Sequence, residues 1–142
     1  MTDNTPRIDH VVLWVRDPVG AAGFYERALG MEPLRVTEYA AGTVSFPSVR
    51  LNEETIFDLA PLTLAERMTM VPGAADSAGH PVNHVCVALG QDDFDALRDR
   101  LQRQAVPVSA ITHDAYGARG MARRSFYFRD PDGNVVEARH YD

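Results

Sequence analysis

Two histidines and two carboxylates stand at matching places in this chain, and side chains of these kinds bind metal ions. His10 and His84 are each the third residue of an eight-residue apolar run. Asp58 follows the first histidine by 48 residues, and Glu137 follows the second by 53. Imidazole nitrogens and carboxylate oxygens are common ligands of zinc, nickel, manganese and iron. The spacing therefore suggests a repeat that supplies one histidine and one carboxylate from each copy.

Such a set has a definite chemistry if its members converge. Two histidines and one carboxylate can hold a divalent ion and leave positions open for substrate or water. A second carboxylate leaves fewer open positions and suits a Lewis-acid role. A buried acid such as Asp58, among apolar neighbours, is costly unless it is paired or bound to metal.

Each residue also has an ordinary explanation when it is taken alone. A single strand histidine is more often a hydrogen-bonded core residue than a ligand. Glu137 can pair with Arg139 or Arg35, and Asp58 can lie at a frayed strand end before Pro61. The matched placement of all four residues favours the metal site over these separate explanations.

Both histidines fall in runs that predict buried strands, residues 8–15 and 82–89. Side chains alternate across a strand, so each histidine and its following valine, Val11 or Val85, lie on opposite faces. If helices cover the two valine faces, both histidines point to the opposite side.

Helix signals follow each of these strands. Asp17 can cap a helix, Pro18 suits the first helical position, and Gly30 is a suitable stop. These residues predict a helix over 18–29. Apolar residues at helical spacing predict a second helix over 92–104.

The remaining stretches complete two β-α-β-β-β modules, over residues 7–60 and 82–142, with a turn-rich linker over 61–81. Residues 112–124 read as a loop, and residues 130–133 supply a hairpin turn. The other expected strands are 34–37, 42–46, 49–51 leading into 55–60, 106–111, 125–128 and 134–139.

Neither module can bury its sheet face alone, so the two are expected to pair. The predicted fold is α+β: two paired βαβββ modules form a curved mixed sheet around a concave metal-binding cavity, with the helices outside. His10, Asp58, His84 and Glu137 would converge in that cavity from four strands.

Further side chains are candidates for proton transfer or substrate contact. The stretch 112–124 has three arginines, two glycines and His113, so it is either a mobile basic loop that closes over an anionic substrate or a solvated surface loop. His113 or Tyr127 can act as acid or base. Cys86 shares the His84 face, either near the metal or as a small packed residue.

Several stretches resemble the vicinal oxygen chelate superfamily, which includes glyoxalase I, extradiol dioxygenases, fosfomycin-resistance thiol transferases and bleomycin-resistance binding proteins. The resemblance covers nearly the whole chain, and its last stretch is specific to the superfamily but much less so to one activity. The stretches are IDHVVL at 8–13, FYERALGM at 24–31, NHV at 83–85 and SFYFRDPDGNVVE at 125–137.

The resemblance implies a paired βαβββ fold with a divalent metal such as Zn, Ni, Mn or Fe(II). It implies that His10, His84 and Glu137 are the ligands, with Asp58 in the place of a further glutamate of glyoxalase I-like members. Tyr127 lies where fosfomycin-resistance proteins have a substrate-contacting tyrosine. The resemblance also implies a homodimer.

Composition excludes some classes of protein. The chain has 142 residues, 45% of them apolar, and a formal net charge of −6, which argues against nucleic-acid binding. No apolar run is long enough for a membrane span. A single cysteine excludes an internal disulfide and favours a cytoplasmic location.

The sequence thus predicts a cytoplasmic metal-dependent enzyme that acts on a small oxygenated organic molecule. A glyoxalase I-like lyase or isomerase, in which the metal stabilises an oxyanion, fits the extra carboxylate. The alternatives are an extradiol-type dioxygenase, a metal-free drug- or metabolite-binding protein and a structural module with a degenerate site.

Overall fold

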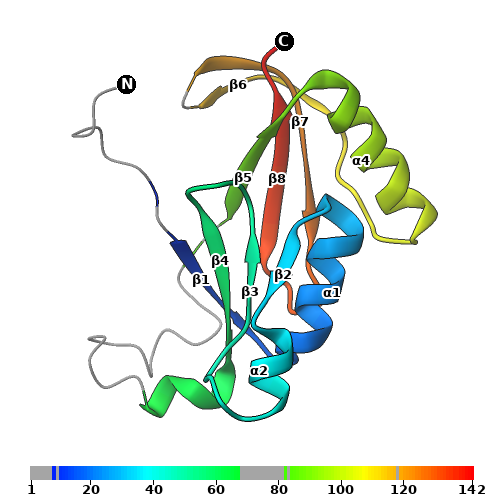
Figure 1. The fold of residues 1–142 in the computed structure, drawn as a ribbon. Helices are drawn as coiled ribbons and strands as arrows, with labels where there is room; N and C mark the ends of the chain where they lie inside the picture. Colours follow the sequence, from blue (N-terminus) through cyan, green and yellow to red (C-terminus); the bar gives the residue numbers. More distant parts are fainter. Residues whose placement is uncertain (1–7, 9, 68–81, 83, 118) are drawn as a thin grey trace. The chain divides into compact units, whose positions relative to one another are not determined.

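The computed structural model describes residues 8, 10–67, 82, 84–117 and 119–142. The chain divides into two compact units, residues 1–81 and 82–142, which we call the N-terminal and C-terminal units. Each unit is built around its own four-stranded sheet (Figure 1). Among the described residues, no helix is long and apolar enough to cross a membrane.

The N-terminal unit has a four-stranded mixed sheet with the strand order β1-β4-β3-β2. The first and last strands, β1 and β4, are parallel neighbours, and the other pairs are antiparallel. The elements are β1 (His10–Val15), α1 (Pro18–Leu29), β2 (Glu32–Leu34), α2 (Val36–Ala40), β3 (Ser48–Arg50), β4 (Ile56–Pro61) and a 3-10 helix (Leu62–Arg67).

The C-terminal unit repeats this topology with the strand order β5-β8-β7-β6, and its first and last strands are again parallel neighbours. The predicted pair of βαβββ modules and the α+β class are therefore confirmed. The elements are β5 (Val85–Leu89), α4 (Gln91–Arg103), β6 (Thr112–Gly117), β7 (Gly120–Arg129) and β8 (Val135–His140).

Local signals set the bounds of α1 as the sequence predicts. The Asp17 side chain accepts a hydrogen bond from the Gly20 N–H at 3.1 Å, and Pro18 is the first helical residue. Gly30 ends the helix with φ 68°, a left-handed conformation that glycine adopts without steric cost. This capping fixes where the chain leaves the helix and enters β2.

Helix α1 packs on the sheet face that lies opposite His10. The fully buried ring of Tyr25 meets the Phe57 ring edge-on, with centroids 5.8 Å apart. Phe57 is the register partner of Val11, so both lie on the face that the helix covers. The predicted assignment of faces is confirmed in this unit.

Helix α4 covers the corresponding face of the second sheet. Phe94 is fully buried and packs its ring on Phe126 and His140, at centroid distances of 5.1 and 4.8 Å. Phe126 pairs with Ala138 and Ala138 with Val87, so α4 lies against the Val87 face. The residues that alternate with Val87 therefore lie on the face away from the helix.

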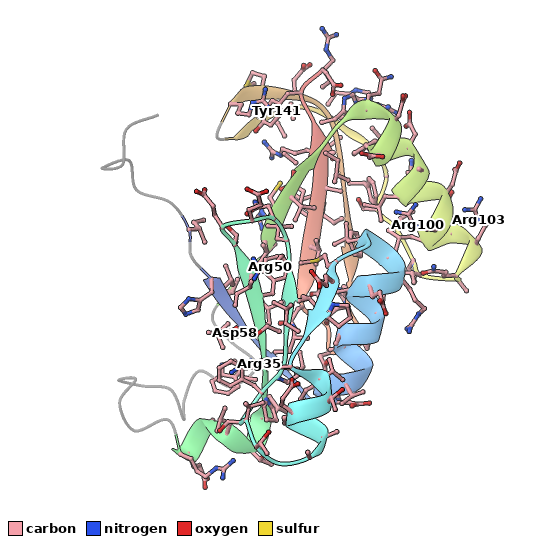
Figure 2. All side chains as sticks on the ribbon, in the orientation of Figure 1. Arg35, Arg50, Asp58, Arg100, Arg103 and Tyr141 are labelled. Atoms are coloured by element: carbon pink, nitrogen blue, oxygen red, sulfur yellow. The ribbon has the colours of Figure 1, made fainter. Side chains whose placement is uncertain are left out.

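The charged residues of α4 complement its helix dipole. Asp92 and Asp93 lie in the first turn, and Arg100 and Arg103 lie in the last turn (Figure 2). Acidic residues near the N-terminus and basic residues near the C-terminus complement the helix dipole. The buried side of this helix consists of Phe94, Leu97 and Leu101.

Two predicted strands of the N-terminal unit are wrong. The strand expected at 34–37 ends at Leu34, and Val36–Ala40 forms helix α2 instead. Arg35 has φ 61°, which breaks the extended backbone. Its guanidinium lies over the Phe46 ring, 4.8 Å from the centroid, and donates to the Phe46 carbonyl at 3.0 Å. These contacts hold the stretch expected as a strand at 42–46 in a turn-rich connection.

Two predictions for the C-terminal unit are also wrong. The strand expected at 106–111 is reduced to an isolated bridge between Val108 and Phe128. The stretch 112–124, expected as a loop, contributes β6 and the first half of β7, which form an antiparallel hairpin. Glycine and arginine made this stretch resemble a loop, but cross-strand pairing overrides that preference.

The hairpin turn after β7 is confirmed. The Asp130 carboxylate accepts the N–H groups of Asp132 and Asn134, each at 2.9 Å, and Gly133 adopts φ 84°. The stretch predicted as a linker, 61–81, begins with the end of β4 and the 3-10 helix, and residues 68–81 lie outside the described part of the chain.

Candidate functional site

The C-terminal unit brings together three predicted site residues on the face away from α4. Glu137 lies on the central strand β8 and is only 1% exposed. Its Oε1 atom lies 3.2 Å from Nε2 of His84, the residue just before β5. The Tyr127 ring, opposite Glu137 on β7, meets the His84 ring edge-on with centroids 5.5 Å apart.

The second oxygen of Glu137 is bound by an arginine. Nη2 of Arg139 donates to Oε2 of Glu137 at 2.8 Å. Nη1 of Arg139 donates to the Tyr141 hydroxyl at 3.1 Å and to the Ala115 carbonyl at 3.4 Å. Burial opposes the charge on Arg139, but the hydrogen bonds to Glu137 and Tyr141 outweigh it and raise the pKa of the guanidinium. Arg139 is therefore a fixed cation.

Two protonated groups adjoin the Glu137 carboxylate. Cys86 is exposed as a residue, but its thiol is partly buried, and this burial together with the Glu137 charge raises the thiol pKa to about 11. Burial and then the Glu137 charge also raise the pKa of Tyr127. Both groups keep their protons near neutral pH, so Tyr127 suits the role of a proton donor rather than a base.

The N-terminal unit places Asp58 and His10 on one face as well. Asp58 on β4 is 8% exposed and accepts a hydrogen bond from the Ser48 hydroxyl at 2.6 Å (Figure 2 shows Asp58 on this sheet). His10 on β1 is level with Ile56, two residues before Asp58. In parallel strands this register puts His10 and Asp58 on the same face, away from α1.

The same register recurs in the C-terminal unit. Val85 is level with Val136, so His84 is level with Val135, two residues before Glu137. Ser48 stands opposite Asp58 as Tyr127 stands opposite Glu137. Each unit thus offers one histidine and one carboxylate in the same relative position on its helix-free face.

The donor atoms suit a divalent ion. Two ligand atoms about 2.1 Å from one ion are about 3.0 Å apart at a right angle and about 3.4 Å apart at the tetrahedral angle. The 3.2 Å between Nε2 of His84 and Oε1 of Glu137 falls in this range. Among the described residues, no group of three or more histidine, cysteine, aspartate or glutamate side chains lies close enough together to hold an ion. The His84–Glu137 pair is therefore two possible ligands and not a complete set.

His113 does not join the other candidates. It lies on β6 opposite Arg124, whose guanidinium pairs with Asp95 of α4 at 2.8 Å and lies over the Phe94 ring. The side of the sheet that carries His113 and Arg124 is therefore the α4 side, opposite the face of Glu137.

Two residues beside the carboxylates matter more in the structure than the sequence indicates. From the sequence, Arg139 is an ordinary partner of Glu137, since residues two apart on a strand share a face. No sequence pattern points to Ser48, because its contact with Asp58 depends on the cross-strand register.

Comparison with known proteins assigns the family. The model of the glyoxalase/bleomycin resistance protein/dioxygenase superfamily matches residues 7–138. The chain belongs to this superfamily. The match spans both units and includes His10, His84 and Glu137.

Individual proteins are similar to this chain over nearly its whole length. A virulence protein of Salmonella typhimurium is 30% identical over 141 residues, which cover 95% of this chain and 84% of that protein. Its crystal structure aligns with a TM-score of 0.72 at 23% identity, over 97% of this chain and 98% of that one. The metallothiol transferase FosB of Lysinibacillus sphaericus is 25% identical over 131 residues, which cover 92% of this chain and 79% of that protein.

A lactoylglutathione lyase from Agrobacterium tumefaciens shares the fold. Its structure aligns with a TM-score of 0.64 at 18% identity, over 97% of this chain and 96% of that one. At this identity the likeness concerns the fold alone, which agrees with the two βαβββ units described above.

Proposed function

We propose that this protein is a metal-dependent enzyme acting on a small oxygenated organic substrate. In this proposal His10, His84 and Glu137 bind one divalent ion, and Asp58 is the fourth ligand. The observation that carries the proposal is the 3.2 Å separation of His84 Nε2 and Glu137 Oε1, which suits two ligands of one ion.

The bound ion would supply Lewis-acid stabilisation of negative charge on a substrate oxygen. The surrounding residues have separate roles. Tyr127 holds its proton and can donate it, or a hydrogen bond, to an oxygen that gains charge. Because Arg139 occupies Oε2 of Glu137, any proton transfer by this carboxylate would use Oε1.

The second carboxylate decides which reaction type we favour. Asp58 is held by Ser48, buried and on the same face as His10, so it is available as a fourth ligand. A four-ligand site favours a glyoxalase I-like lyase or isomerase over an extradiol-type dioxygenase, which fits a three-ligand iron site. Zn, Ni, Mn and Fe(II) are all compatible with these donors.

One contact favours a second candidate function, a metal-free binding protein. Arg139 already compensates the Glu137 carboxylate, so the buried charge needs no ion to be stable. A cavity lined by such compensated groups could sequester a drug or metabolite. In both candidates the partner is a small molecule, and from the family we expect a cytoplasmic homodimer.

Metal analysis and turnover separate the two functions. The chain would be purified without chelator, analysed for bound metal, and assayed with the thiohemiacetal of methylglyoxal and glutathione and, after loading with Fe(II), with a catechol. We expect stoichiometric metal and metal-dependent turnover, both lost in His84→Ala. The matched control is His113→Ala, which removes an imidazole from the opposite face. A metal-free protein that binds an aromatic ligand and turns over neither substrate would refute the enzyme proposal.

A further inference from the structure

Arg139 is held in place by hydrogen bonds to three residues. Its guanidinium donates to Glu137 and Tyr141, both from the β8 end of the chain, and to the Ala115 carbonyl of β6. The arginine side chain is 7% exposed and the Glu137 side chain is 2% exposed. Two opposite charges thus face each other in an almost fully buried position, where water screens them little.

Arg139 and His84 contact different oxygens of the Glu137 carboxylate. Oε2 accepts from Arg139 at 2.8 Å, whereas Oε1 lies 3.2 Å from His84 Nε2. A carboxylate with both oxygens available can bind an ion through one or both. Because Arg139 occupies Oε2, an ion that also binds His84 would use Oε1.

The donors of Arg139 point to a role inside the protein rather than to substrate binding. Nη1 and Nη2 are occupied by protein acceptors, and Nε is buried without a hydrogen-bond partner among the described residues. By contrast, Arg123 is exposed. It lies on β7 two residues before Ser125, the register partner of Arg139, and therefore on the same face as Arg139. Arg139 therefore acts through Glu137.

We propose that Arg139 is a positioning residue that weakens metal binding and keeps the metal-free protein stable. The guanidinium restricts Glu137 to one ligating oxygen and compensates its charge when no ion is present. This inference rests on the proposed metal site at His84 and Glu137. Partners of metal ligands commonly strengthen metal binding by orienting the ligand. Arg139 differs because it carries charge of the same sign as the ion, 2.8 Å from a ligand oxygen.

The test compares Arg139→Met with Arg139→Lys and with Arg123→Met in the full chain. Arg139→Met removes the charge and frees Oε2, Arg139→Lys restores a cation, and Arg123→Met removes one exposed charge from the same face. Zn²⁺ affinity would be measured by competition with a chromophoric chelator, and thermal unfolding would be followed with and without Zn²⁺.

We expect Arg139→Met to bind Zn²⁺ at least about tenfold more tightly than the wild type, with a larger rise in Tm on metal addition. Arg139→Lys and Arg123→Met should stay within about threefold of the wild type. If Arg139→Met folds only with metal, it can be purified loaded and the affinity measured by chelator extraction. Equal or weaker binding in Arg139→Met, beside a wild type that binds Zn²⁺, would overturn this inference alone. A wild type that binds no Zn²⁺ would overturn the proposed function as well.

Discussion

Arg139 donates a hydrogen bond to Oε2 of Glu137 at 2.8 Å, from two residues further along the same strand. Strand alternation puts both side chains on the helix-free face, where both are buried. The glutamate that we propose as a metal ligand is therefore already paired with a cation of its own chain. We expect the stability of the C-terminal unit to depend on this pair.

Glu137→Gln should destabilise the metal-free protein by about 3 kcal/mol, because it leaves the buried Arg139 charge uncompensated. Urea denaturation followed by circular dichroism measures this loss. Asp95→Asn is the control, since it breaks the more exposed Arg124–Asp95 pair and should cost less than about 1 kcal/mol. Equal stability of the two variants would contradict the importance of the buried pair.

Ser48→Ala should lower the free energy of unfolding by about 1.5–3 kcal/mol, because the Asp58 carboxylate loses a short buried hydrogen bond. If Asp58 is a ligand, the same variant should also bind metal about 10–100-fold more weakly. Thr43→Ala, at an exposed hydroxyl that bonds a backbone carbonyl, is the control. A destabilised Ser48→Ala with unchanged metal affinity would exclude Asp58 from the ligand set.

Tyr127→Phe should lower kcat by about 10²–10⁴-fold if the Tyr127 hydroxyl donates in the reaction, and metal content should not change. His113→Ala should leave kcat and metal content unchanged, because His113 lies on the α4 side of the sheet. Steady-state kinetics on both variants checks this difference. A large loss in His113→Ala with a mild effect in Tyr127→Phe would reverse the assigned roles.

Cys86 should react slowly with iodoacetamide. With a thiol pKa of about 11 instead of the ordinary 9.0, the thiolate fraction at pH 8 is about a hundredfold lower. The greater nucleophilicity of a high-pKa thiolate offsets part of this, so alkylation should be about tenfold slower than for a free thiol.

Because ionisation of the Cys86 thiol is incomplete below about pH 11, its alkylation rate should keep rising through pH 10, whereas that of an ordinary thiol levels off near pH 9. Mass spectrometry gives a direct readout, since the chain has a single cysteine. A rate that levels off near pH 9 would contradict the burial of the thiol beside the Glu137 carboxylate.

The parts of the fold that depend on local signals could be predicted from sequence. Asp17, Pro18 and Gly30 set the bounds of α1, and strand alternation put His10 and His84 on the helix-free faces. The topology followed from the repeat, because each unit has one strand, a helix and three further strands in the same order, and α2 is an addition to the N-terminal unit.

The wrong predictions of secondary structure lie where contacts between elements override the local conformational preference of the sequence. Helix α2 is five residues long and begins after Arg35 in a left-handed conformation that no local signal predicts. Strand β6 has a loop-like composition but pairs along β7. The Ser48–Asp58 contact needed the register, whereas the Glu137–Arg139 contact was available from the two-residue spacing alone.

The central proposal is that His10, His84 and Glu137 bind one ion. It is tested most directly by the metal content of the wild type, His10→Ala and His84→Ala after loading with Zn²⁺ and removal of the excess. The proposal predicts one ion per chain in the wild type and loss of that ion in both variants. A His10→Ala variant that keeps a full ion at unchanged affinity would contradict it, because His10 would then not be a ligand.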